Sequence, residues 1–280
     1  MKITIVYFSG TGNTAWVVQE LARQLAGLGD EVAAYSCETI EPRDERLLDG
    51  DVLGLAFPVH GSWAPRPVRA FLAGLPPGDG RPLFALACAA YAGGDAAWYA
   101  ARPLAARGYV PFLYANVYMP NNLIYPVPTR EQVPPILEKA GRKIARLAPL
   151  IHERRRHLEG VHPGGWLIGL LQRPLAKPLE GWAARRLVAD ETCTHCGWCA
   201  EHCPVGNIEV VDGEAHGEEV RGEYIRGEFI RWGDDCLLCL RCFHGCPRQA
   251  IQWGDLTRNE STFRRYPGPD GRYHPPSHRA

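Results

Sequence analysis

The sequence has no net charge and no long apolar run. Its 31 lysines and arginines balance 31 aspartates and glutamates, so the chain as a whole has no electrostatic attraction to nucleic acid or to a lipid surface. No apolar run reaches the roughly 18 residues that a membrane-spanning helix needs. Residues 1–8 lack the long apolar core and the cleavage site of a secretory signal. We therefore expect a cytoplasmic protein with no transmembrane segment and no nucleic-acid partner.

The charges are unevenly distributed along the chain. Residues 190–255 carry 13 acidic side chains against 5 arginines, whereas residues 142–186 carry 10 basic side chains against 3 glutamates. Opposite charges should draw these two segments together. Within the basic segment, residues 160–186 contain an apolar stretch that includes Trp166 and Trp182. We expect this stretch to pack between two domains, and the alternative is that it lies on a membrane surface.

Eight of the ten cysteines follow one spacing, Cys-x2-Cys-x2-Cys-x3-Cys-Pro, which occurs twice. The first run contains Cys193, Cys196, Cys199 and Cys203, and the second contains Cys236, Cys239, Cys242 and Cys246. A cubane iron–sulfur cluster needs four thiolates, and a tight loop with three cysteines leaves the fourth to come from elsewhere. In the two-cluster arrangement the last cysteine of each run serves the other cluster. The sequence therefore predicts that Cys246 completes the first cluster site and Cys203 the second.

Two other uses of the cysteines are less compatible with this pattern. Zinc sites also use Cys-x2-Cys pairs, but as separated pairs and not as two runs of four. Disulfides at this spacing would be strained, and nothing in the sequence indicates export. The remaining Cys37 and Cys88 lie in apolar surroundings, and we interpret them as small core residues. Residues 190–254 thus resemble the bacterial two-cluster ferredoxins, which implies two [4Fe-4S] clusters in a small α+β domain.

The N-terminal segment has the pattern of a strand, a glycine-rich loop and a helix. Residues 2–8 are β-branched and apolar, and the residues after the loop have helical spacing. The loop contains Ser9, Gly10, Thr11, Gly12, Asn13 and Thr14. A glycine-rich loop at a helix N-terminus holds a phosphate through backbone amides, and the absence of lysine and arginine favours a monophosphate over a nucleoside triphosphate. The alternatives are a dinucleotide loop, with Glu38 as the ribose-binding acid, and a turn that binds no ligand.

Four further strands are predicted, at residues 31–36, 51–57, 82–88 and 109–117, with helical segments between them. Such alternation predicts a five-stranded, doubly wound parallel sheet. Ligands of these sheets bind beyond the carboxyl ends of the strands.

The loop at residues 9–14 matches the S/T-x-T-G-N-T pattern of flavodoxins, and this resemblance implies a flavodoxin-like fold that binds FMN. It also implies that the loops after the third and fourth strands hold the flavin ring. The residues concerned are Pro58, Val59, His60, Gly61, Trp63, Ala90, Tyr91, Gly93, Gly94 and Asp95. Trp63 and Tyr91 are the expected stacking partners of the ring. The alternatives are that Trp63 packs against its own helix and that His60 is an ordinary surface residue.

Together the two halves resemble flavodoxin/ferredoxin fusion proteins, sometimes called ferrodoxins. The expected divisions are a flavodoxin-like domain at residues 1–157, a linker at 158–188, a ferredoxin domain at 189–256 and a disordered tail at 257–280. The resemblance implies an electron carrier that passes single electrons between the two clusters and FMN and meets redox partner proteins. The alternatives are a flavin-dependent reductase of a small or quinone-like acceptor, in which His60, Tyr91 or Asp95 handles protons, and a docking domain that binds no flavin.

Overall fold

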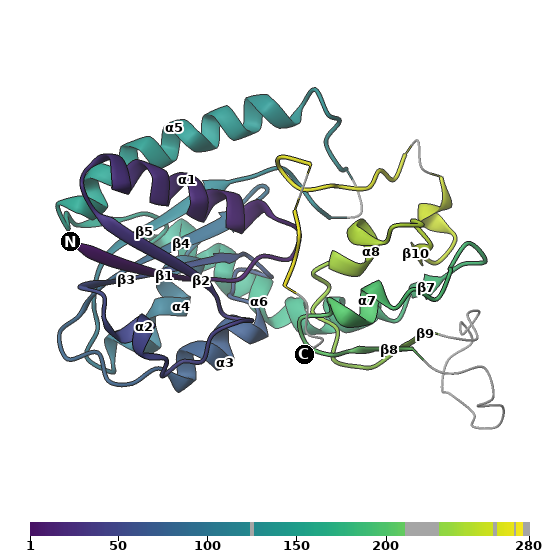
Figure 1. The fold of residues 1–280 in the computed structure, drawn as a ribbon, viewed down its shortest axis with the longest axis horizontal. Helices are drawn as coiled ribbons and strands as arrows, with labels where there is room; N and C mark the ends of the chain where they lie inside the picture. The colour runs from purple at the N-terminus through teal and green to yellow at the C-terminus, as the bar shows by residue number, and fades with distance from the viewer. Residues whose placement is uncertain (124–125, 211–229, 260–261, 272, 277–280) are drawn as a thin grey trace.

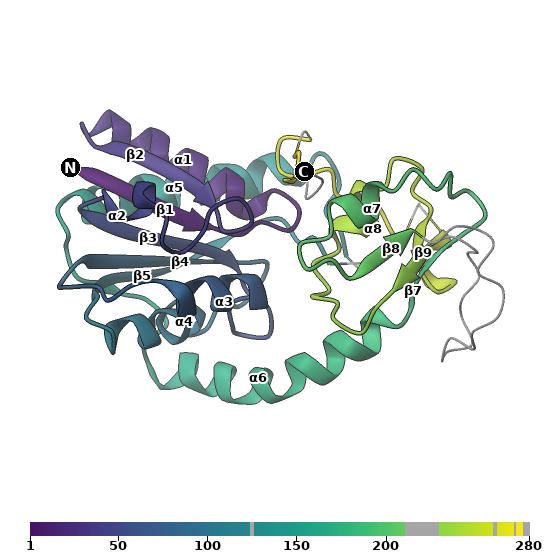
Figure 2. The same cartoon turned by 60° about the horizontal axis from the view of Figure 1, so that its bottom comes forward.

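The computed structural model describes residues 1–123, 126–210, 230–259, 262–271 and 273–276. Figures 1 and 2 show a larger α/β part and a smaller C-terminal part, connected by one long helix. A near-perfect tandem repeat in the sequence, at residues 221–225 and 226–230, lies outside the described residues except for Ile230.

The larger part is built on a parallel sheet with the strand order β2-β1-β3-β4-β5-β6. The strands are β1 (Lys2–Tyr7), β2 (Glu31–Ser36), β3 (Val52–Pro58), β4 (Pro82–Ala89), β5 (Val110–Tyr118) and β6 (His157–Leu158). The first five strands have the flavodoxin-like order 2-1-3-4-5, and their bounds agree with the sequence prediction to within about a residue. The sixth strand corrects the prediction of five. It has two residues, which pair with Leu113 and Tyr114 at the sheet edge, and is too short to produce a periodic pattern.

Helices cover both faces of this sheet (Figure 1). They are α1 (Asn13–Gly27) and α5 (Val133–His152) on one face, and α2 (Glu45–Leu48), α3 (Arg66–Gly74) and α4 (Ala96–Ala105) on the other. Because both faces are covered, the central strands are apolar throughout instead of alternating. Every residue of β3 except Pro58 is buried, and every residue of β4 except Pro82.

The C-terminal part is a small α+β unit, as predicted. Its strands β7 (Leu187–Ala189) and β10 (Ile251–Trp253) form one antiparallel pair, and β8 (Ile208–Val210) and β9 (Ile230–Trp232) form another. Two short helices, α7 (Trp198–Glu201) and α8 (Arg241–Gly245), each begin inside a cysteine motif, and a 3-10 turn at Leu256–Arg258 follows the last strand. The core of this unit contains Phe243 and, around it, several of the motif cysteines.

The predicted linker is mostly one 22-residue helix, α6 (Pro163–Ala184). It runs beside the larger part and reaches the smaller one (Figure 2). At its C-terminal end the indole nitrogen of Trp253 donates a 2.7 Å hydrogen bond to the carbonyl oxygen of Ala183. The helix therefore contacts both parts, but large apolar side chains such as Leu170 and Leu171 are exposed, which corrects the expectation that this stretch is packed between two domains. Within the described ranges, no helix is long and apolar enough to cross a membrane.

The tail corrects the prediction of disorder for its described residues. Tyr266 is buried, and its hydroxyl donates a 2.6 Å hydrogen bond to Oδ1 of Asn13. The hydroxyl of Tyr273 donates a 2.7 Å hydrogen bond to the carbonyl oxygen of Ser9. Two aromatic rings thus fix a segment whose composition lacks a periodic core pattern. Residues 277–280 lie outside the described part of the chain.

Candidate functional site

The motif cysteines line two cavities, four to each. One cavity is lined by Cys193, Cys196 and Cys199 together with Cys246 from the other motif. The second is lined by Cys236, Cys239 and Cys242 together with Cys203. We call these the first and the second cavity. The structure thus groups the cysteines crosswise, in the combination that the sequence predicts.

The backbone of each motif turns sharply at two equivalent positions. His195 and Gly197 have φ values of 54° and 73°, and Leu238 and Leu240 have values of 50° and 59°. Three of these four residues are not glycine, so the left-handed conformation has to be maintained by the surrounding packing. These turns wrap each loop around its cavity and bring backbone amides toward sulfur. The amide of Leu238 lies 3.3 Å from Sγ of Cys236, and that of Asn207 lies 3.2 Å from Sγ of Cys203.

The donor set and its surroundings fit an iron–sulfur cluster. Burial raises the pKa of both Cys199 and Cys239 to about 12, so these thiols are protonated at neutral pH in the metal-free protein. A metal group that binds here has to displace these protons. Among the described residues, no three His, Cys, Asp or Glu side chains are placed to hold a single metal ion. Four thiols around a cavity, with amides directed at sulfur, are the ligand set of a [4Fe-4S] cluster.

The phosphate loop lies between β1 and the N-terminus of α1. Oγ of Ser9 accepts hydrogen bonds from the amides of Gly12, at 3.1 Å, and Ala15, at 3.3 Å, and thereby holds the loop closed. Gly12 has a φ of 100°, which favours glycine. The hydroxyl oxygen of Thr14 is buried and has no nitrogen or oxygen partner among the described residues, but it lies within hydrogen-bonding reach of the Cys88 thiol. A buried threonine hydroxyl at a helix N-terminus, where the first backbone amides lack intrahelical acceptors, fits the phosphate of FMN.

The other loop side chains have protein partners. Asn13 donates a 2.8 Å hydrogen bond to the carbonyl oxygen of Pro120, and Thr11 accepts one from Asn122 at 2.5 Å. Tyr273 packs directly on the loop, since a Cβ atom at Gly12 would lie 2.8 Å from Cβ of Tyr273. The loop is therefore enclosed by residues 120–122 and by the tail.

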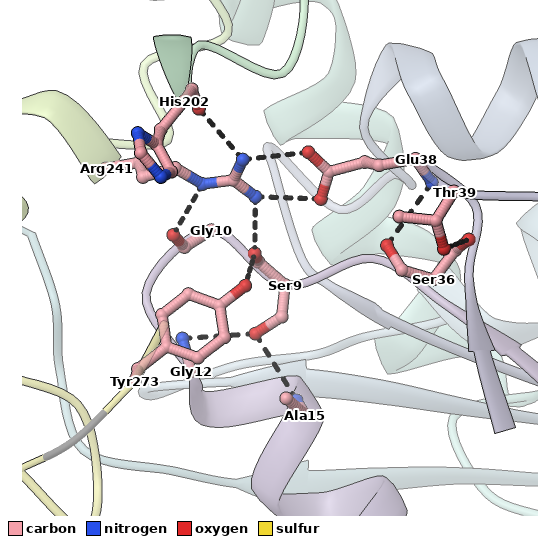
Figure 3. Close-up of polar contacts among 10 residues, drawn as sticks. All are labelled: Ser9, Gly10, Gly12, Ala15, Ser36, Glu38, Thr39, His202, Arg241 and Tyr273. Atoms are coloured by element: carbon pink, nitrogen blue, oxygen red, sulfur yellow. Dashed lines mark hydrogen bonds and ion pairs between the residues drawn. The ribbon is translucent and has the colours of Figure 1, made fainter. Parts of the chain in front are cut away.

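Arg241, inside the second cysteine motif, connects that motif to the phosphate loop (Figure 3). Its guanidinium group is 2% exposed and forms two 2.8 Å hydrogen bonds to the carboxylate of Glu38. It also donates to the carbonyl oxygens of Ser9, Gly10 and His202, at 2.8, 3.1 and 2.9 Å. Arginine has five N–H donors, so the guanidinium group is fully satisfied.

The ion pair between Arg241 and Glu38 also bears on the dinucleotide alternative. Burial by itself lowers the pKa of Arg241, but the hydrogen bonds and charge of Glu38 outweigh this and raise the pKa overall. Glu38, the proposed ribose-binding acid, is itself 2% exposed in this pair. Glu38 is therefore not available to bind a ribose, as the dinucleotide alternative requires. No sequence pattern marks Arg241, because it occupies a position that the cysteine spacing leaves unspecified.

The second cavity adjoins the phosphate loop directly. A Cβ atom at Gly10 would lie 3.1 Å from the carbonyl oxygen of Cys239, which is tighter than an ordinary contact, so a side chain here would require Cys239 to shift. Leu237, in the same motif, is buried in the core of the larger part. Residues that line the first cavity, such as Ile230 and Ile251, belong instead to the core of the C-terminal part.

The two predicted flavin-ring loops emerge at the same edge of the sheet. They follow β3 and β4, which are neighbouring parallel strands, and the phosphate loop follows the adjacent β1. The ring of Trp63 lies 3.9 Å from the guanidinium carbon of Arg69 and 5.4 Å from the ring of Tyr99. This arrangement corresponds to the alternative in which Trp63 packs against its own helix. Tyr91 is 66% exposed, which leaves its ring accessible for stacking.

His60 belongs to the contact between the two parts. Its ring forms a hydrogen bond with the backbone of Leu237, and burial lowers its pKa to about 4. His60 is therefore neutral at pH 7, and its 3.9 Å approach to Glu180 of α6 is not an ion pair at that pH.

Helix α6 is fastened to both flavin-ring loops. Arg173 forms a largely buried ion pair with Asp95 of one loop and donates a 3.1 Å hydrogen bond to the carbonyl oxygen of Ser62 in the other. The hydroxyl of Ser62 donates a 2.6 Å hydrogen bond to Gln172. Arg173 and Gln172 were missed in the sequence, where no motif marks them. These contacts commit Asp95 to positioning α6.

Residues 192–251 match the protein family described as "4Fe-4S dicluster domain". Solved structures similar to the N-terminal half include oxidised Flavodoxin 2 from Bacillus cereus, at 20% identity over 55% of this chain and 99% of that chain, with a TM-score of 0.42. Two-electron reduced Megasphaera elsdenii flavodoxin shares 21% identity over 51% of this chain and 98% of that chain, with a TM-score of 0.38. No curated protein matches the chain.

The fold of the N-terminal part is established by its strand order and not by these similarities. The parallel order 2-1-3-4-5 is flavodoxin-like, and a match to the 4Fe-4S dicluster family covers most of the C-terminal part. The chain therefore combines a flavodoxin-like domain with a 4Fe-4S ferredoxin domain, an architecture that supports an electron-transfer role.

Proposed function

We propose that the chain passes single electrons between two [4Fe-4S] clusters and an FMN. Cys193, Cys196, Cys199 and Cys246 would hold one cluster, and Cys203, Cys236, Cys239 and Cys242 would hold the other. Residues 9–14 would hold the FMN phosphate, and the loops after β3 and β4 the flavin ring. When bound, a cluster exchanges one electron at a time, whereas a flavin takes up one or two.

The observation that carries this proposal is the contact between Gly10 and Cys239. The site that fits a phosphate and the cavity lined by Cys239 share a wall, in which a Cβ atom at Gly10 would lie 3.1 Å from the carbonyl oxygen of Cys239. Electrons would therefore pass between groups held on the two sides of this wall without a diffusing carrier. Arg241 fixes the relative position of the two sides, and the buried Leu237 and Leu240 help to keep water away from the second cavity.

Counting the bound groups tests this function. Protein purified without oxygen should contain one FMN, about eight iron atoms and about eight acid-labile sulfides per chain. Low-temperature paramagnetic resonance of the reduced protein should show interacting signals from two clusters. Zinc in place of iron, or iron without sulfide, would contradict the cluster proposal. Failure to take up FMN on reconstitution would instead leave the N-terminal part as a docking domain.

The reductase alternative has less support in the described residues. Of its three candidate proton-handling residues, Asp95 is paired with Arg173 and His60 is bonded to Leu237. Only Tyr91 projects its side chain into solvent.

A further inference from the structure

Helix α6 presents large apolar side chains to solvent. They form a stripe along the helix and are exposed to between 47% and 69%: Trp166, Leu167, Leu170, Leu171, Leu175 and Trp182. Their spacing of three, four and seven residues places them on one side of a helix. From Trp166 to Trp182 the stripe is about 24 Å long, at about 1.5 Å per residue.

The opposite side of α6 is small and polar. Gly165, Gly169 and Ala183 are buried against the protein, and Gln172 and Arg173 form the hydrogen bonds to Ser62. In a globular protein the apolar side of a surface helix normally faces the core. In α6 the four leucines of the stripe instead face outward, while its two tryptophans contact rings of the protein, Trp98 and Trp253.

The charges around the stripe are basic at both ends. Near its beginning, Trp166 packs against Trp98 with ring centroids 6.3 Å apart, and Arg102 lies over Trp98. At its end, the guanidinium carbon of Arg186 lies 3.7 Å from the ring centroid of Trp182. The only acidic residue of α6 is Glu180, which is half-buried and faces His60. The exposed side of the helix therefore combines apolar and basic groups without an acid.

We propose that α6 docks the protein onto an anionic phospholipid surface. Leucine and tryptophan side chains would enter the headgroup region, and Arg102, Arg185 and Arg186 would face the lipid phosphates. Amphipathic helices that lie in a membrane interface have this combination of residues, and tryptophan is enriched at that depth. Because α6 packs against both parts of the protein, docking would hold both of them at the same surface.

The charges disfavour a second copy of the chain as the occupant. Both ends of the stripe are basic, so two copies paired in either direction would bring arginines together. An anionic surface neutralises both ends at once. This inference concerns a surface and does not depend on which cofactors the protein carries.

Vesicle co-sedimentation of the full-length protein with its bound groups tests this proposal. The probes are vesicles of phosphatidylcholine alone and vesicles that also contain phosphatidylglycerol. We expect binding to the anionic vesicles, weakened by salt because the arginine contribution is screened. The double variant Leu170→Glu/Leu171→Glu should bind at least about tenfold more weakly, because it removes two apolar side chains from the interface and adds charges of the lipid's own sign. Arg185→Gln/Arg186→Gln should also lose binding, by about fivefold per arginine.

The matched control is Leu28→Glu/Leu48→Glu, which changes two exposed leucines, at 42% and 45%, that lie outside α6 and the C-terminal part. It should bind anionic vesicles like the unaltered protein. The visible absorbance of the bound groups reports whether each variant is folded. If Leu170→Glu/Leu171→Glu is not folded, Leu167→Gln/Leu175→Gln is measured in its place. No binding to anionic vesicles, or equal binding by the stripe variants, overturns the proposal. Self-association that the stripe variants abolish, without vesicle binding, assigns the stripe to a second copy.

Discussion

Two copies of one cysteine motif lie in different surroundings, and one position accounts for much of the difference. Between the second and third cysteines, the first motif has Trp198 where the second has Arg241. Trp198 stays within its own unit, stacked on His202 with ring centroids 4.4 Å apart. Arg241 leaves its unit and bonds to the phosphate loop and Glu38. The cysteine spacing thus determines the cysteine-lined cavity, and the residue between the second and third cysteines determines which part of the protein packs beside that cavity.

The two cavities differ accordingly in their exposure. Cys196, at the first cavity, is exposed, whereas Cys239, at the second, packs against Gly10 of the flavodoxin-like domain. The first cavity is therefore the more accessible to another protein, and the second is the one next to residues 9–14, the loop that we propose to hold the FMN phosphate. The predictions below test whether Arg241, His60 and the tail maintain this asymmetry.

The largest expected effect is that of Arg241→Met. The variant leaves the carboxylate of Glu38 buried without its partner, which should lower the free energy of unfolding by about 3–5 kcal/mol. Chemical denaturation of the protein with its bound groups measures this change. The matched control is Arg231→Met in β9, which is exposed and should change stability by less than about 0.5 kcal/mol. Adding Glu38→Leu to Arg241→Met should restore part of the loss. Equal stability of the two arginine variants would show that Arg241 does not hold the parts together.

A smaller effect is expected from two histidines at the contact between the parts, the partly buried His60 and the buried His244. Burial lowers the pKa of His60 from its ordinary 6.5 to about 4, so only the unfolded chain binds this proton between those values. The free energy of unfolding therefore includes the whole contribution of His60 above pH 6.5. It loses on the order of 2–3 kcal/mol of this contribution as the pH decreases to 4. His244, whose pKa burial also lowers to about 4, should add a similar dependence.

The melting temperature measured between pH 7.5 and pH 4.5 tests this dependence. The melting temperature of His60→Gln should fall less between pH 7.5 and pH 4.5 than that of the unaltered protein, because the variant retains only the contribution of His244. His274→Gln, at an exposed position of the tail, should follow the unaltered protein. If the melting temperature of His60→Gln has the same pH dependence as that of the unaltered protein, His60 does not form the proposed contact between the two parts.

The smallest effect is expected at the tail. Tyr273→Phe removes the hydrogen bond to the carbonyl oxygen of Ser9 and should cost about 0.5–1.5 kcal/mol. The loss is limited because Arg241 still donates to the same oxygen. Tyr91→Phe, at a side chain that is 66% exposed, is the control and should be neutral in the same denaturation experiment. If both tyrosine variants are neutral, the tail does not stabilise the phosphate loop.

Patterns that depend on local sequence predicted much of this molecule. Apolar runs predicted the strands from β1 to β5, and the cysteine spacing predicted the grouping of Cys246 with the first motif and Cys203 with the second. These features follow from periodicity or from ligand geometry, which neighbouring residues encode.

Features that depend on contacts between distant segments were missed. Arg241 and Glu38 are 203 residues apart, and no local signal joins them. The tail has no periodic core pattern, and yet Tyr266 and Tyr273 find partners on the phosphate loop. The apolar residues of α6 were recognised, but their outward direction depends on Arg173 and Gln172, which fasten the opposite side of the helix.

The central claim is that each motif completes the cage of the other, and paired serine variants test it most directly. Low-temperature paramagnetic resonance, with iron and sulfide counts, is recorded for Cys203→Ser, Cys239→Ser, Cys246→Ser and Cys196→Ser, with Cys37→Ser as a control that should leave both clusters intact. The crosswise arrangement predicts that Cys203→Ser alters the same cluster signal as Cys239→Ser, and Cys246→Ser the same signal as Cys196→Ser. If Cys203→Ser instead shares its signal with Cys196→Ser, each motif holds its own cluster and the claim is contradicted.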